Sequence, residues 1–260
     1  MAPRLPLNPP PGNPAGPVTF GYTLRLATDP ADVRGAQALR FSVFNLELNE
    51  GLPSAFQTGL DADPFDEVCD HLLVVEQPAV EVVGTYRLQT GAAAAGNRGY
   101  YSAQEFDFTP FESRRHEILE LGRACVHRDH RSLAVLSLLW KGIAAYARKH
   151  QARSLIGCSS APTTDPAVGA RLYADLSRRH LAAPEWRTSP LTHRACPLER
   201  QAAAAVKVPR LLAAYLSIGA CICGPPALDR EFKTVDFLTL ADLQALPSRV
   251  ADHYLGGAVL

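Results

Sequence analysis

The order of the predicted elements indicates an α+β fold with a mixed, mostly antiparallel sheet. Strands and helices do not alternate as regular βαβ units, and neither a Gly-x-Gly-x-x-Gly motif nor a P-loop is present. Of the 260 residues, 47% are hydrophobic and 20% are charged, the usual balance for a globular domain. The sequence therefore predicts a globular α+β protein without the usual nucleotide-binding motifs.

Hydrophobic periodicity places the elements in order along the chain. Strands are expected at 22–27, 71–75, 81–88, 117–126, 154–158, 220–223 and 234–240. Helices are expected at 29–44, 132–150, 166–181 and 208–218. The first helix has Asp29 as its N-cap and Pro30 at its first position, and Gly219 ends the last helix. Segment 45–70 is predicted to be an acidic loop, and 92–97 a turn of small residues.

The predicted domain organisation is a disordered, Pro-rich tail at 1–20 and a single domain at 21–260. The tail holds seven prolines and no apolar segment typical of a signal peptide. The longest apolar run, 211–224, is shorter than the ~20 residues that span a bilayer. We expect a cytoplasmic protein, with peripheral membrane contact left open.

Charge and cysteine usage exclude several classes of function. Lys+Arg and Asp+Glu both number 26, which argues against a nucleic-acid-binding protein. The six cysteines include no Cys-x-x-Cys pair and are expected to be free thiols. His116, His127 and His130 lack further zinc ligands, and the Asp61-x-Asp63 run lacks the glycine and glutamate of a calcium loop. Neither a metal ion nor a cofactor is expected.

An acidic run contains Asp61, Asp63, Asp66 and Asp70, with Glu47 and Glu50 upstream. Carboxylates of this kind attract a cationic amino acid, although a solvated acidic loop would have the same composition. A second alternative is a nucleophilic thiol at Cys158, activated by His71, His127 or His130.

An ordered series of motifs resembles a known enzyme family. The motifs are Arg40-Phe-Ser-Val-Phe44, Asp61-Ala-Asp-Pro-Phe-Asp66, Asp70-His-Leu-Leu-Val74, Gly84-Thr-Tyr-Arg-Leu88, Tyr101-Ser-Ala-Gln-Glu-Phe-Asp107, Glu120-Leu-Gly-Arg123 with Val126, Leu138-Leu-Trp-Lys-Gly142, and Gly224-Pro-Pro-Ala-Leu-Asp-Arg-Glu-Phe232. Together they resemble the N-acyl amino acid synthases and ornithine lipid N-acyltransferases, often labelled hemolysin-like and related to the acyl-homoserine-lactone synthases.

The resemblance implies a GNAT-like fold in which 161–207 is a helical insertion before the last helix. It implies acyl carrier protein as donor and an amino acid, with ornithine favoured, as acceptor. It places Glu120 and Arg123 in the active-site cleft, with Glu120 as amine ligand or general base and Arg123 as carboxylate ligand or structural ion-pair partner. Arg40 and Arg87 match further cleft arginines, either of which could hold an acidic neighbour or the acceptor's carboxylate. Phe44, Asp61, Asp66 and Asp70 belong to the acceptor-binding motifs. Glu120 and Arg123 would point to opposite faces of a regular strand unless a bulge at Gly122 intervenes.

The donor site is predicted where the strand ending at Val126 meets the following helix. GNAT enzymes cradle the coenzyme A pyrophosphate there in a glycine-rich loop. Arg131 fits the first position of that loop, but Ala134 and Leu136 replace its small residues. This departure favours a 4'-phosphopantetheine thioester carried on acyl carrier protein, with Arg128 and Arg131 as candidates for docking the acidic carrier.

Tyr215 resembles the GNAT tyrosine that protonates the leaving thiolate, although a packed helix tyrosine is an equal alternative. Two other functions remain open at this point. One is an acyl-homoserine-lactone synthase that uses S-adenosylmethionine; the other is a non-catalytic lipid-binding protein.

Overall fold

A computed structural model describes residues 18–19 and 21–249 of the chain. The strands are β1 Val18–Thr19, β2 Tyr22–Leu26, β3 Asp70–Glu76, β4 Glu81–Thr90, β5 Ile118–Val126, β6 Ser154–Ala161, β7 Cys221–Ile222, β8 Ala227–Asp229 and β9 Thr234–Asp242. Residues 1–17 of the predicted tail lie outside the described residues, whereas Val18–Thr19 pair with β2. The assignment of 1–20 as a tail therefore extended too far.

The described helices are α1 Pro30–Arg40, α2 Ala55–Thr58, α3 Gly91–Gly96, α4 Leu133–Lys149, α5 Pro166–His180 and α6 Arg210–Ser217. Short turns of 3-10 or π-helix complete the set: η1 Phe41–Glu47, η2 Pro64–Glu67, η3 Tyr101–Gln104, η4 Thr109–Glu117, η5 Arg128–His130, η6 Pro184–Trp186 and η7 Thr192–Arg194. Within the described residues, no helix is both long and apolar enough to cross a membrane.

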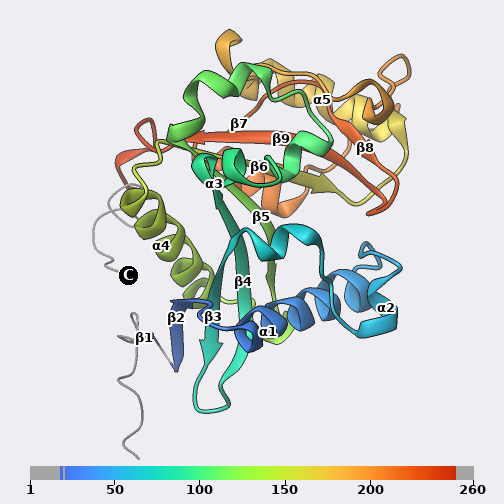
Figure 1. Cartoon of the computed structure of the whole chain (residues 1–260). Coiled ribbons are helices and arrows are strands. Elements are labelled where there is room, and N and C mark those ends of the chain that lie inside the picture. Colours follow the sequence, from blue (N-terminus) through green and yellow to red (C-terminus); the bar gives the residue numbers. More distant parts are fainter. Residues whose placement is uncertain (1–17, 20, 250–260) are drawn as a thin grey trace, which may run out of the picture.

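The strands form one sheet in the order β1-β2-β3-β4-β5-β6-β9-β7, with β8 paired to β9 (Figure 1). The β5–β6 pair is parallel, and the other described strand pairs are antiparallel. This mixed, mostly antiparallel sheet with flanking helices confirms the predicted fold class.

Helices α1 and α4 cover opposite faces of the first half of the sheet (Figure 1). Strand β3 shows the alternation that makes this possible, because successive side chains point to opposite faces. Leu72 and Val74 pack in the main core with the apolar face of α4, whereas Leu73 and Val75 pack with Ala36 of α1. Both faces of this strand are therefore buried.

Local capping sets the starts of these two helices. The Asp29 side chain accepts the backbone N–H of Asp32 at 2.9 Å and Pro30 occupies the first turn, as predicted. Ser132 caps α4 by accepting the N–H of Val135. The first helix does not simply end near residue 44: α1 passes at Arg40 into the π-helical segment η1.

The prediction of a turn at 92–97 was wrong, because Gly91–Gly96 form helix α3. Thr90 accepts the N–H of Ala93 at 3.1 Å and so caps the helix. The alanines that follow have the highest intrinsic helix propensity. A run of small residues was mistaken for a turn.

The segment predicted as an insertion packs against the second half of the sheet (Figure 1). Helix α5 contributes Leu172 and Leu176 to a core cluster with Leu212 of α6 and Phe237 of β9. Isolated bridges then join Leu181 to β7 and Ala195 to β8. This half of the molecule places β8 and β9 beside the site.

Candidate active site

A cavity of about 290 Å³ opens where strands β5 and β6 separate. The two strands pair only over Ile118–Glu120 and Ser154–Ile156. Beyond that point both strands line the cavity, with 121–124 on one side and 157–160 on the other. Gly157, just past the last pair, still lies close to β5, since a Cβ atom there would lie 2.3 Å from the carbonyl oxygen of Leu121.

A β-bulge brings Glu120 and Arg123 to the same cavity. The β4–β5 register shifts between Thr85 and Arg87, and Arg123 has a positive φ of 48°. Both Glu120 and Arg123 line the cavity, although regular alternation would separate them. The bulge that was expected at Gly122 is therefore found one residue later, at Arg123.

Glu120 holds the 3-10 turn η3 at the cavity wall. Its two carboxylate oxygens accept the backbone N–H groups of Tyr101 and Ser102, each at 2.8 Å. Burial raises the pKa of Glu120, and these hydrogen bonds act in the opposite direction. The predicted active-site glutamate thus also positions a segment of the lining.

Arg87 and Arg123 reach the cavity from adjacent strands and share one carboxylate. Arg87 Nη1 lies 2.7 Å from Asp63, and Arg123 Nη2 lies 2.9 Å from the same side chain. The guanidinium groups also stand over the ring of Tyr101, at 4.9 and 5.3 Å. Arg87 Nη2 is buried and has no hydrogen-bond partner, which leaves one donor for a ligand.

The acidic loop is largely neutralised by arginines. Arg40 is fully buried and pairs with Asp61 at 3.0 Å and Asp66 at 2.6 Å. Although burial acts against it, the Arg40 and Arg87 guanidinium groups hold the pKa of Asp66 well below its usual range. Arg40, Asp61 and Asp66 do not line the cavity, and Asp70 accepts the hydroxyl of Tyr146 at 2.5 Å. These four residues, predicted to bind substrate, make structural contacts.

The other end of the cavity is predominantly apolar. Tyr215 of α6 shares a 2.5 Å hydrogen bond with Tyr86 and packs edge-on against Trp140 at 5.8 Å. Burial raises the pKa of Tyr86 to about 12 and that of Tyr215 well above its usual value. Both phenols therefore keep their protons at neutral pH. Phe44 lines the cavity as well.

Comparisons with known proteins agree with this geometry. The acetyltransferase (GNAT) domain family model matches residues 39–141. An L-ornithine N(alpha)-acyltransferase of Agrobacterium fabrum is 33% identical over 90% of this chain and 85% of its own length. Its counterpart from Rhodobacter capsulatus is 35% identical over 90% of this chain and 95% of its own. The chain belongs to the L-ornithine Nα-acyltransferase family. It is an N-acyltransferase, which confirms the family resemblance and the predicted enzyme class.

Solved structures share the fold of this acyltransferase at low sequence identity. The N-acyl amino acid synthase FeeM, from uncultured soil microbes, has a TM-score of 0.51 and 9% identity over 86% of this chain and 91% of its own. The AHL synthase LasI has a TM-score of 0.51 and 14% identity over 92% of this chain and 96% of its own. The GNAT-like fold is thereby confirmed.

The predicted donor residues lie at the end of β5 and the start of α4. Arg131 donates from Nε to the Val126 carbonyl at 3.2 Å, and its other nitrogens pair with Glu47 at 2.7 Å each. Arg128 is exposed, and Ala134 is partly buried in the first turn of α4. The guanidinium of Arg131 therefore already has an anionic partner.

Cys158, the alternative nucleophile, lines the cavity. Its thiol points to Glu105 Oε1 at 3.9 Å. Burial, reinforced by the negative charge of Glu105, raises the pKa of the thiol well above its usual value. These surroundings disfavour the thiolate that nucleophilic catalysis requires.

The sequence analysis missed three acidic residues that line the cavity: Glu105, Asp229 and Asp236. Glu105 and Asp229 belong to motifs that carried the family resemblance, but no role was assigned to them. All three are buried, and burial together with the charges of Asp236 and Asp229 raises the pKa of Glu105 to about 9. Acidic residues inside otherwise apolar strand and loop segments were the available signal.

Proposed function

We propose that this enzyme transfers a long-chain fatty acyl group from the 4'-phosphopantetheine thioester of acyl carrier protein to the α-amine of ornithine. The product is an N-acylornithine, a lyso-ornithine lipid. The names of the relatives support the acceptor. The bulkier side chains at Ala134 and Leu136 support a carrier-bound donor over free coenzyme A, because they hinder close approach of a pyrophosphate.

The observation that carries this proposal is the division of the cavity into a charged and an apolar part. Arg87 Nη2 offers an unused donor to the α-carboxylate of an amino acid. Trp140, Leu155 and Tyr215 form an apolar wall suited to an acyl chain. Leu48 and Leu211 line the same cavity and are 44% and 43% exposed, which supports lipid contact at its mouth.

In the proposed reaction the neutral α-amine attacks the thioester carbon directly. Backbone N–H groups of β5 beyond the β5–β6 pairing are suited to stabilise the oxyanion that forms on the carbonyl oxygen. Collapse of the tetrahedral intermediate breaks the C–S bond. Tyr215 donates a hydrogen bond to the departing thiolate and keeps its own proton, and the thiolate finally takes up the proton released by the amine. The ammonium proton of the attacking amine passes to a base, for which Glu120 is the candidate.

The test is an assay of the purified protein with a long-chain acyl–acyl carrier protein and a panel of amino acids, with products identified by mass. We expect N-acylornithine as the main product. Putrescine, which lacks the α-carboxylate, should be a poor acceptor. Arg87→Lys keeps a charge for Asp63 but removes the second guanidinium nitrogen, so it should raise KM for ornithine about 10-fold without doing so for putrescine.

Two results would contradict the proposal. Activity only with an acyl-coenzyme A donor would refute the proposal that acyl carrier protein supplies the acyl group. Product formation only with S-adenosylmethionine would support the alternative of an acyl-homoserine-lactone synthase.

A further inference from the structure

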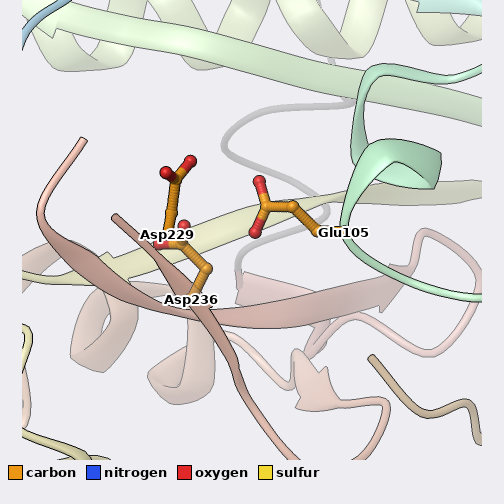
Figure 2. A group of neighbouring side chains, drawn as sticks. All are labelled: Glu105, Asp229 and Asp236. Carbon is orange, nitrogen blue, oxygen red and sulfur yellow. The ribbon is translucent and has the colours of Figure 1, made fainter. Parts of the chain in front are cut away.

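Three buried carboxylates converge on one side of the cavity. Glu105 follows η3, Asp229 ends β8 and Asp236 lies on β9, and their side chains point toward one another (Figure 2). One oxygen from each lies within 4.8 Å of the others. Their relative exposures are only 3%, 4% and 3%.

The polar contacts of this acidic cluster (Glu105, Asp229 and Asp236) leave two oxygens without partners. Asp229 Oδ1 accepts the N–H groups of Glu231 at 2.8 Å and Phe232 at 3.2 Å, and Asp236 Oδ2 accepts the Thr234 hydroxyl at 3.1 Å. Glu105 Oε2 and Asp236 Oδ1 are buried and accept no hydrogen bond from an N–H or O–H group of another residue type, so a proton shared between these two carboxyl groups is the contact left to them. Burying such oxygens unpaired is unfavourable, so their retention beside a cavity points to a ligand.

The acidic cluster also has fewer cationic partners than carboxyl groups. The described cationic partner is Arg194, whose Nη1 lies 3.3 Å from Asp229 Oδ1. By contrast, Asp61, Asp63 and Asp66 are paired with Arg40, Arg87 and Arg123. The acidic group with fewer arginine partners is therefore not the run that stands out in the sequence. Burial and the neighbouring carboxylates raise the pKa of Glu105 and Asp236, so a bound cation would take the place of the protons that they hold.

We propose that the acidic cluster binds the side-chain ammonium of the amino acid acceptor and so makes the enzyme selective for a diamino acid. The proposal rests on the proposed function and assigns its acceptor specificity. An ammonium carries three N–H donors, which match the two unpaired oxygens and Asp229. The acidic cluster and Arg87 line the same cavity. The side-chain ammonium of the acceptor would therefore lie at the carboxylates, and its α-carboxylate at the guanidinium of Arg87.

A metal ion suits the acidic cluster less well. Calcium takes six to eight oxygen ligands and magnesium takes six, whereas three carboxylates are present. The Arg194 guanidinium beside Asp229 repels a divalent cation more strongly than it repels a monovalent one. A monovalent ammonium is the better match in charge and in number of donors.

The experiment compares ornithine with norvaline, which has the same carbon chain but no side-chain amine. Norvaline leaves the buried carboxylates unpaired, so the wild type should prefer ornithine about 100-fold in kcat/KM. Asp236→Asn and Glu105→Gln should reduce kcat/KM for ornithine about 30-fold, mainly through KM, with little change for norvaline. Asp107→Asn, on an exposed carboxylate two residues from Glu105, is the matched control and should behave as wild type.

Equal losses for ornithine and norvaline in folded variants would overturn the proposal. Thermal shifts with ornithine, norvaline and magnesium or calcium test binding without catalysis. Stabilisation by ornithine over norvaline that disappears in Asp236→Asn supports the proposal even if no acyl transfer occurs, so failure of the proposed function is distinguishable. Stabilisation by a divalent ion that ornithine does not compete away would overturn it in favour of a metal site.

Discussion

The hydroxyl groups of Tyr86 and Tyr215 lie 2.5 Å apart, joining strand β4 to helix α6 at the cavity wall. The raised pKa of each group keeps both protonated, so one proton lies between them and the other can be donated elsewhere. This arrangement would donate a hydrogen bond to a leaving thiolate from a site with little solvent.

Replacing Tyr215 with phenylalanine should lower kcat about 10-fold and leave KM for the acceptor unchanged. The effect is modest because a thiol with a pKa near ~8.5 leaves without much assistance. Steady-state kinetics with Tyr173→Phe, on helix α5 and outside the cavity lining, provide the control. A Tyr215→Phe enzyme with wild-type kcat would remove the tyrosine from the mechanism.

Replacing Arg40 with methionine should destabilise the protein by about 3–5 kcal/mol, because two buried carboxylates each lose one of their arginine partners. Arg34→Met, on the same helix but exposed, should change stability by no more than about 0.5 kcal/mol. Urea unfolding followed by circular dichroism measures both values. If the Arg40 variant keeps its stability and loses only acceptor binding, Arg40 belongs to the acceptor site after all.

Replacing Glu120 with glutamine should lower stability by about 1–3 kcal/mol, because an amide NH₂ would face one of the two backbone N–H groups that the carboxylate now accepts. It should also lower kcat by displacing η3. Unfolding curves and kinetics on one preparation separate the two effects. Full stability combined with loss of the low-pH limb of the pH–rate profile, along which a general base gives up its proton, would instead identify Glu120 as a general base alone.

The stability of the unliganded protein should fall as the pH rises from about 5 to about 9. In the unfolded chain a glutamate releases its proton near pH ~4.3, whereas the folded chain holds the Glu105 proton to a pKa of about 9. Between these values the folded state binds more protons, so its stability decreases with pH. Glu105→Gln should flatten this dependence in urea titrations at several pH values; an unchanged slope would show that Glu105 titrates normally.

Locally encoded features could be predicted from the sequence. The cap at Asp29 and the apolar periodicity of α4 need only neighbouring residues, so these helices were placed within a few positions. Glu120 and Arg123 were assigned to the cavity by the family resemblance, because local strand alternation alone would have placed them on opposite faces.

Features that depend on distant residues could not be predicted. The pairing of Asp61 and Asp66 with Arg40 is settled only by folding, which turned an apparent acceptor-binding run into a neutral network. The acidic cluster unites residues 105, 229 and 236, which no local pattern connects. A bulge was considered at Gly122, but its presence and its position at Arg123 depend on the pairing register with β4, which composition does not reveal.

The apolar wall of the cavity also belongs to the hydrophobic core. Tyr86, Leu155 and Ala241 line the cavity and pack in the main core cluster. A substitution that enlarges this wall, such as Leu155→Ala, removes core packing and costs about 2–5 kcal/mol. The length of acyl chain that the enzyme accepts is therefore coupled to its thermal stability. Evolution toward a longer acyl chain would require stabilising substitutions elsewhere in the fold.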